Sequence, residues 1–129
     1  NLRYWHNLSG LGVGPSASSY IHGRRWRNPP DVREYLRRIR AREPLGIDVE
    51  TLDPKARAGE TAMLQLRLTE GIDCESFAAT TGFDPCDLFA GPIARHVSDG
   101  LLAATSTHIA LTPKGRLVAD TIIADFLRP

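Results

Sequence analysis

A loop of small residues near the start of the chain is the segment best suited to bind a ligand. It runs Leu11-Gly-Val-Gly-Pro-Ser-Ala-Ser-Ser-Tyr20, with glycines at positions 12 and 14. Because glycine has no side chain, such a loop lets backbone N–H groups come close to a phosphate or a carboxylate. It lacks the third glycine and the following helix of a dinucleotide-binding fingerprint, so by itself it is a weak indicator of ligand class.

The other side chains that commonly do chemistry are scattered along the chain. Cys74 and Cys86 do not have the spacing of metal ligands, and no two histidines are four residues apart. These histidines are His6, His22, His96 and His108. We therefore predict no catalytic residue and no metal ligand in this chain. Two cysteines are also too few for a disulfide scaffold, which favours a reducing, cytoplasmic location.

Charge is distributed unevenly along the chain. Residues 1–45 hold nine Arg and three acidic residues, a balance of +6, whereas residues 46–129 have a balance of −5. The two parts are therefore expected to belong to different structural units. The basic part suits an anionic ligand that bears propionates or phosphates, with Arg24 and Arg25 close to the loop in sequence. The alternative is a solvated, arginine-rich helix face.

The chain of 129 residues is long enough for one domain, or for one domain and part of another. It begins with Asn rather than Met, so we expect it to be a piece of a longer protein. No apolar run approaches the roughly 20 residues of a membrane-spanning helix, so no integral membrane segment is predicted.

The first part of the chain is expected to contain two short structures. Residues 11–14 look like the end of a buried strand, and residues 19–26 form a hairpin that turns at His22-Gly23. Asn28 is the expected cap of a helix with Pro29 at its first position. The apolar positions of that amphipathic helix are spaced i, i+3, i+4 and i+7, namely Val32, Tyr35, Leu36 and Ile39. Proline, glycine and aspartate then indicate a linker, placed at residues 46–54.

The second part, residues 55–129, is predicted to be mainly helical. A helix covers residues 56–68, and Asp73 and Asp84 begin two more helices that end near Gly82 and Gly100. Residues 101–111 form a hairpin, and Thr112-Pro113 starts a last helix. The order helix, helix, helix, hairpin, helix is that of a winged-helix domain.

A winged helix raises the possibility of DNA binding, in which the third helix would enter the major groove. Here Asp84, Asp87 and Asp99 lie at or near the ends of that helix, and phosphate repulsion would oppose docking. We therefore predict no nucleic-acid partner. A non-catalytic interaction module is the alternative that the sequence leaves open.

Five segments in order resemble the C-terminal third of one radical S-adenosylmethionine (SAM) family. This family contains the oxygen-independent coproporphyrinogen III oxidases and the HemW heme chaperones. Asn1-Leu-Arg-Tyr4-Trp5 is similar to the H-N-x-x-Y-W signature of the chaperone branch, and residues 11–20 are similar to L-G-x-G-x-x-A-x-S-Y. The other similar segments are Arg25-Trp-Arg-Asn28, Glu60 to Gly71, and Leu111-Thr-Pro-Lys-Gly-Arg116.

The resemblance implies an α+β protein in which residues 1–45 are the C-terminal edge of a partial (β/α) barrel. Residues 55–129 would then be the winged-helix-like C-terminal domain. The intact protein would bind SAM and a [4Fe–4S] cluster held by a C-x3-C-x2-C motif, which this chain lacks. The fragment alone would therefore not be catalytic.

The resemblance also implies which residues contact ligands. Gly12, Gly14, Ser16, Ala17 and Ser18 would face the cofactor. Many relatives have G-A-H-S where this chain has Ser-Ala-Ser-Ser19, so a role for that histidine does not transfer. The residues expected near heme or substrate are Asn1, Tyr4, Trp5, Arg24 and Arg25.

The N-x-x-Y-W segment favours the chaperone, which would bind heme and deliver it to an acceptor protein. The alternative is the oxidase, which would decarboxylate the propionates of coproporphyrinogen III to vinyl groups.

Overall fold

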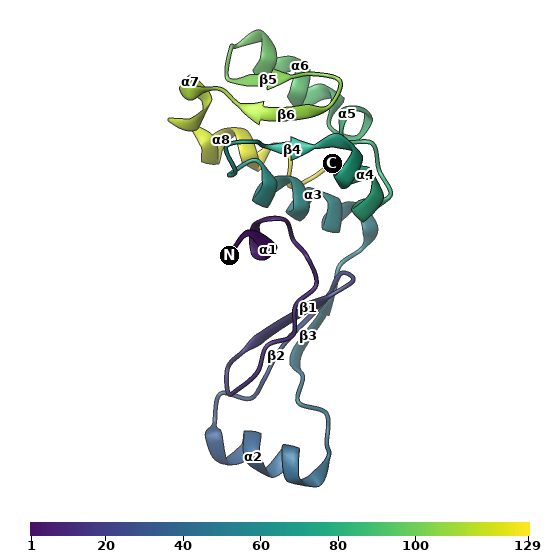
Figure 1. Ribbon diagram of the computed structural model, residues 1–129, viewed down its shortest axis with the longest axis vertical. Coiled ribbons are helices and arrows are strands. Elements are labelled where there is room, and N and C mark those ends of the chain that lie inside the picture. The colour runs from purple at the N-terminus through teal and green to yellow at the C-terminus, as the bar shows by residue number, and fades with distance from the viewer. The chain divides into compact units, whose positions relative to one another are not determined.

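The computed structural model describes all 129 residues and divides them into two compact units. Unit 1 comprises Asn1–Asn7 and Pro54–Pro129, and unit 2 comprises Leu8–Asp53. Each unit combines helices with a three-stranded antiparallel sheet, which confirms the predicted α+β class (Figure 1).

Unit 2 is built on a sheet with the order β1-β2-β3. Strands β1 (Ser18–Ile21) and β2 (Arg24–Arg27) form the predicted hairpin. At its turn His22 and Gly23 have φ values of 48° and 83°, the two positive values that a type I′ turn requires. This turn suits the right-handed twist of the strands, which is why the short pattern sufficed to predict it.

The linker predicted at residues 46–54 is wrong, because β3 (Ile47–Thr51) occupies most of it and pairs with β2. The strand has little apolar alternation, and four of its five residues are exposed. Its place in the sheet comes from backbone pairing and from ion pairs of Asp48 and Glu50 with arginines of β2. Composition alone could not show that pairing.

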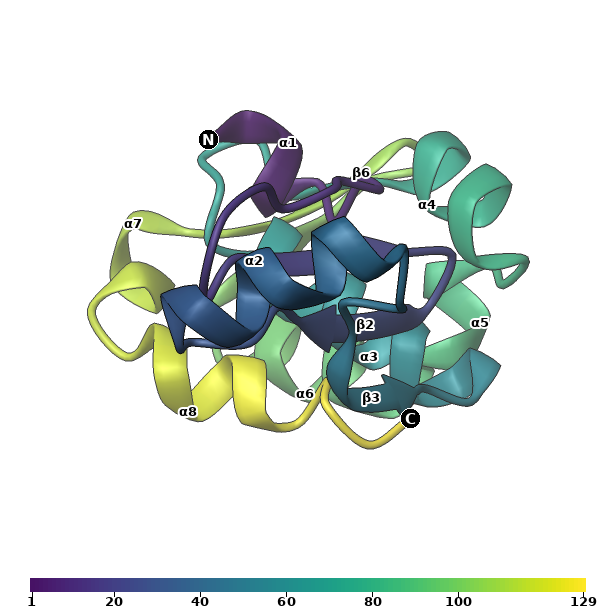
Figure 2. The same cartoon turned by 90° about the horizontal axis from the view of Figure 1, so that it is seen from below.

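Helix α2 (Val32–Ala41) begins three residues later than expected. Asp31, not Asn28, is its cap, and the Asp31 carboxylate accepts the N–H of Glu34 at 2.8 Å. Of the predicted apolar positions, only Tyr35 is buried. The reason is the position of α2, which lies across the end of the sheet rather than against one of its faces (Figures 1 and 2).

Unit 1 has the element order that the sequence predicted for residues 55–129, with three differences. The last predicted helix is divided into two short helices, α7 and α8. Phe89 divides the third helix in two, and a short strand, β4, precedes the second helix and pairs with β6. Its elements are α1 (Leu2–Trp5), α3 (Pro54–Gln65), β4 (Ile72–Asp73), α4 (Cys74–Thr81), α5 (Pro85–Leu88), α6 (Ala90–Ser98), β5 (Leu102–Ala104), β6 (His108–Leu111), α7 (Pro113–Arg116) and α8 (Ala119–Ala124).

Side-chain caps define the helix starts of unit 1. Asp73 accepts the N–H of Ser76 at 2.7 Å, and Asp84 accepts the N–H of Cys86 at the same distance. Each cap satisfies a backbone donor that has no partner within the helix. The predictions for both aspartates are confirmed.

The hydrophobic core of the molecule lies in unit 1. The rings of Phe77, Phe89 and Phe126 are fully buried and adjacent, with centroids 6.1 and 5.0 Å apart along the series. Burial of each ring stabilises the fold by about 2 kcal/mol. Aliphatic residues from α3, α8 and all three strands complete the core. Unit 1 therefore has a core of its own.

Candidate functional site

The glycine loop of unit 2 does not continue a buried strand, contrary to our prediction. Gly10 makes a single antiparallel bridge to Tyr20, and the following residues as far as Ala17 form no strand. Leu11 and Val13 are exposed, Val13 by 84%. A short apolar run is typical of a buried strand, which is why the sequence predicted one here. The residue pattern does not show the hydrogen bonds that hold this segment as a loop.

Those hydrogen bonds come from three buried polar side chains. Asn28 Nδ2 donates to the carbonyl oxygens of Gly12 and Gly14, at 3.2 and 2.9 Å. Ser19 Oγ accepts the N–H of Gly12 at 2.9 Å, and the Tyr35 hydroxyl accepts the N–H of Gly14 at 3.1 Å. The loop is thus preformed, but these two glycine amides are already engaged within the protein. They are not free to bind an anion, as the sequence pattern had suggested.

The two glycines are required for different reasons. A Cβ at Gly12 would overlap the carbonyl oxygen of Ser18, whereas Gly14 has a φ of 101°, which other residues rarely adopt. By contrast, Gly10 has open space around it. The small residues therefore allow a tight, internally bonded loop.

A cavity of about 450 Å³ lies beside the loop within unit 2. Its walls are mostly apolar and come from residues 11–13, β2, β3, Tyr35 and the segment 44–46. Trp26 supplies an aromatic wall, and Arg24 is the only charged residue that lines it. No His, Cys or Met lines the cavity, and the Tyr35 hydroxyl, the one other group there of a type that can bind a heme iron, accepts the N–H of Gly14.

The three arginines of β2 lie on both faces of the strand. Arg24 and Trp26 line the cavity, while the intervening Arg25 forms an ion pair with Glu50 at 2.7 Å. Arg27, two residues further along, pairs with Asp48 at 2.9 Å. Successive side chains of a strand point to opposite faces, so Arg24 is the one arginine of β2 that lines the cavity. It makes no ion pair, and it is exposed.

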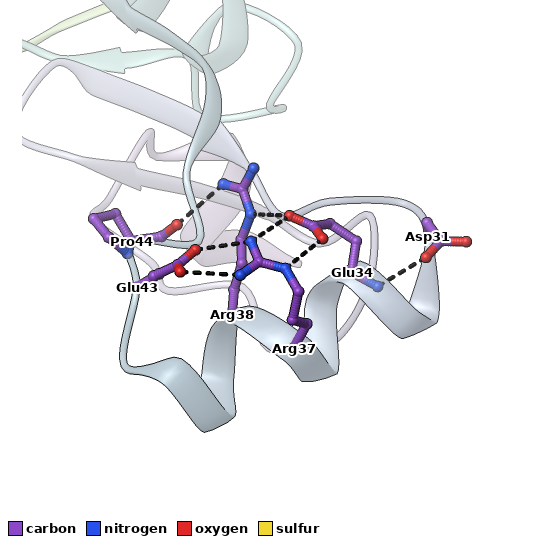
Figure 3. Close-up of polar contacts among 6 residues, drawn as sticks. All are labelled: Asp31, Glu34, Arg37, Arg38, Glu43 and Pro44. Atoms are coloured by element: carbon purple, nitrogen blue, oxygen red, sulfur yellow. Dashed lines mark hydrogen bonds and ion pairs between the residues drawn. The ribbon is translucent and has the colours of Figure 1, made fainter.

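Two of the four arginines of α2 are neutralised by neighbouring carboxylates (Figure 3). Arg37 bonds to both Glu34 and Glu43, and Arg38 bonds to Glu34. Hydrogen bonds from Arg37 and Arg38 lower the pKa of Glu34 to about 2, and the carboxylates raise the pKa of Arg37. Unit 2 as a whole has eight Arg and six acidic residues, a balance of only +2. The predicted basic region is therefore a solvated helix face that is ion-paired in part.

The structure brings together only part of the predicted site. Gly12 and Arg24 line one cavity, with Gly14 in the loop beside it, whereas Ser16, Ala17 and Ser18 do not line it. Asn1, Tyr4 and Trp5 belong to α1 and its cap in unit 1. The rings of Tyr4 and Trp5 meet edge to face at 5.4 Å.

Sequence reasoning missed the residues that shape the loop. The sequence pattern predicts a helix cap at Asn28 and an apolar stripe that includes Tyr35, and it indicates no role for Ser19. An asparagine before two prolines fits a cap, but nothing local reveals that its amide reaches back 14 and 16 residues to two carbonyls. Trp26, between two arginines, became a cavity wall only when β3 paired beside it.

No three His, Cys, Asp or Glu side chains gather closely enough to hold a metal ion. Cys74 and Cys86 in unit 1 are free thiols. Burial, together with Cys86 and the negative charges of Asp84 and Asp73, raises the pKa of Cys74 to about 11. No helix has the length and apolar character needed to cross a bilayer.

Comparison with known proteins places these features in a family. A model of the HemN C-terminal domain matches residues 52–118, which is 67 of the 129 residues. The heme chaperone HemW of Bacillus subtilis (strain 168) is 28% identical over 127 residues, covering 98% of this chain and 34% of the relative. HemW of Mycobacterium tuberculosis (strain ATCC 25618 / H37Rv) is equally identical over 98% of this chain and 30% of its own length. HemW of Synechocystis sp. is 35% identical over 74 residues, which is 56% of this chain and 18% of the relative.

A solved structure shows the same fold. It is coproporphyrinogen III oxidase (HemN) from Escherichia coli, described as a radical SAM enzyme, with a TM-score of 0.65 at 22% identity. The match covers 92% of this chain and 28% of that one. This chain therefore spans about a third of the length of the relatives that it matches. Since the family model accounts for more than half of its residues, the chain belongs to the HemN C-terminal domain family.

Proposed function

We propose that this chain is the C-terminal part of a HemW-type heme chaperone. One observation carries the proposal: HemW relatives are similar over 98% of this chain, across both compact units. The intact protein would bind SAM, a [4Fe–4S] cluster and heme in the cytoplasm, and would deliver heme to an acceptor protein. The cluster ligands would lie outside this chain, because its two cysteines do not form a cluster motif.

The contribution of this chain would be one wall of the heme site. The apolar cavity of unit 2 suits the edge of a flat porphyrin, and Trp26 provides an aromatic surface for it. Arg24, which has no carboxylate partner within the chain, would bind a heme propionate. The iron ligand would come from elsewhere, since no His, Cys or Met lines the cavity and the Tyr35 hydroxyl is bonded to the glycine loop.

The remaining residues keep supporting roles in this proposal. Gly12, Gly14, Ser16, Ala17 and Ser18 would form the surface that faces the cofactor, with Asn28 and Tyr35 keeping the loop in shape. Separately, the α1 segment with Asn1, Tyr4 and Trp5 is proposed to contact heme in the intact protein.

The test is heme titration of the full-length gene product and two matched variants. We expect Arg24→Gln to weaken heme binding by about tenfold, the value of one lost charge-assisted hydrogen bond. Arg25→Gln, on the same strand but ion-paired to Glu50 on the other face, should bind heme like the parent. Equal affinities for all three proteins would remove Arg24 from the site. A parent protein that does not bind heme would overturn the proposed function.

The oxidase remains a second candidate because the fold matches that of the coproporphyrinogen III oxidase structure. The two candidates differ in chemistry. Anaerobic incubation with SAM, a one-electron reductant for the cluster, an electron acceptor and coproporphyrinogen III would yield carbon dioxide and vinyl groups from an oxidase, and no product from a chaperone.

A further inference from the structure

A second cavity lies within unit 1, between the turn that follows α3 and the segment from β6 to α8. Its volume is about 240 Å³, and it shares no lining residue with the cavity of unit 2. Figure 1 shows the turn after α3 on the same side of unit 1 as helices α7 and α8. The proposed heme function gives this cavity no role.

The side chains that line the cavity offer positive charge and hydrogen-bond donors. Arg67 and Arg116 bring two guanidinium groups, Thr69 brings a hydroxyl, and no Asp or Glu is among the lining residues. Neither the hydroxyl nor the backbone N–H of Thr69 has a hydrogen-bond partner within the protein, and Arg116 is exposed and makes no ion pair. Donors of this kind bind the oxygens of a carboxylate or a phosphate.

Two glycines fix the backbone around the cavity. Gly71 ends the turn that carries Arg67, and a Cβ there would overlap the carbonyl oxygen of Ile109. A Cβ at Gly115 in α7 would likewise overlap the carbonyl oxygen of Leu101. Because both segments are closely packed, a ligand would not have to order them when it binds.

Arg67 already has a carboxylate partner, but a ligand can displace it. Arg67 Nη2 lies 2.9 Å from Asp120 Oδ1, and the Asp120 side chain is 87% exposed. Such an exposed ion pair adds little to stability, because water solvates both charges. The positive charge that remains unbalanced at the cavity is that of Arg116. A bound anion would balance it.

The volume and the walls restrict which anion can enter. About 240 Å³ is below the roughly 300–1,000 Å³ of pockets that enclose drug-sized ligands. Leu66 and Leu111, both buried, form part of the wall. We propose that the cavity of Arg67, Thr69 and Arg116 binds a small oxyanion, a carboxylate or a phosphate ester, whose short apolar stem contacts these leucines. This site is separate from the proposed heme function and does not depend on it.

The test is calorimetric titration of the full-length gene product with isobutyrate and with isopropyl phosphate, in a buffer free of other oxyanions. The two probes share an isopropyl group and differ in the charged group, so the tighter one identifies the class of ligand. We expect binding that Arg116→Gln weakens at least about tenfold, because a charge-assisted hydrogen bond is lost. Arg128→Gln, which changes another exposed arginine of unit 1, should bind like the parent.

A second variant should change the affinity in the opposite direction. Asp120→Asn removes the carboxylate that competes for Arg67, so it should tighten binding several-fold. Asp87→Asn removes the same charge from the first turn of another short helix, α5, and should leave the affinity unchanged. Both aspartates are exposed, so both variants should fold.

Two further measurements locate the ligand. The NMR signal of the Thr69 amide should move during the titration, and Arg116→Gln should bind heme like the parent. Equal anion affinity in the parent and Arg116→Gln, or no binding of either probe, would overturn the anion site. Loss of heme affinity in Arg116→Gln would also overturn it, because the cavity would then belong to the heme site.

Discussion

At the scale of single residues, Asn28 determines the shape of the glycine loop. Its buried side chain donates to two carbonyls, those of Gly12 and Gly14. Asn28→Ala would leave both carbonyls without this donor, at a cost of about 1–3 kcal/mol. We expect the Gly12 and Gly14 amides to exchange at least about tenfold faster in this variant.

Hydrogen exchange followed by NMR measures this directly. Asn1→Ala is the matched control, because Asn1 is exposed and its side chain caps nothing. Unchanged exchange at both glycines in Asn28→Ala would show that the loop keeps its shape without the amide.

The two thiols should differ in reactivity. Cys86 is exposed, whereas the pKa of the half-buried Cys74 is raised to about 11, mainly by burial. Only the thiolate is alkylated, so at pH 8 about one Cys74 side chain in a thousand is reactive. We expect iodoacetamide to modify Cys86 first, and the rate at Cys74 to rise about tenfold per pH unit up to pH ~10.

Mass spectrometry of Cys74→Ser and Cys86→Ser proteins separates the two rates. Equal rates at pH 8 would contradict the burial of Cys74.

At the scale of elements, α2 depends on its ion pairs because its apolar side is exposed. Arg37 and Arg38 lower the pKa of Glu34 from 4.5 to about 2, and Arg37 lowers that of Glu43. A carboxyl group with a lowered pKa in the folded state stabilises it above the unfolded pKa. That contribution is lost as the pH falls from about 4.5 towards 2.

We therefore expect the Cα chemical shifts of α2 to move from helical towards random-coil values over this pH window. The Glu34→Gln variant should show less α2 helicity at pH 7 and a smaller further loss in acid. Because the pairs are exposed, 1 M salt should reduce the effect. If the Cα chemical shifts of α2 stay constant from pH 7 to pH 2, the ion pairs are not needed to keep the helix folded.

At the scale of the whole molecule, the two units should unfold separately. Unit 1 contains the phenylalanine core, whereas unit 2 buries little apolar surface. Each unit has one tryptophan, Trp5 in unit 1 and Trp26 in unit 2. We expect the denaturant midpoint of unit 2 to lie below that of unit 1 in the 129-residue chain.

Single-tryptophan variants report each unit on its own. Trp26→Phe leaves the fluorescence of Trp5, and Trp5→Phe leaves that of Trp26. Coincident transitions in the two variants would show that the chain unfolds as one cooperative body.

Local chemistry was sufficient to predict much of the fold. Asp73 and Asp84 cap their helices, and His22-Gly23 forms its hairpin turn, because caps and turns are set by a few neighbouring residues. The helices and the hairpin of residues 55–129 could likewise be predicted, because their periodicity and their turn residues are also local features of the sequence. Family motifs also placed the chain correctly, since the HemN C-terminal domain model matches residues 52–118 and a HemW relative is 28% identical over 98% of the chain.

Only the tertiary structure decided the candidate site. β3 became a strand through pairing with β2, and that pairing placed Glu50 opposite Arg25 and Thr51 opposite Arg24. Asn28 became the support of the loop because chain folding brought two distant carbonyls within reach of its amide. Such contacts depend on which segments meet in space, and the pattern of residues within one segment does not contain that information.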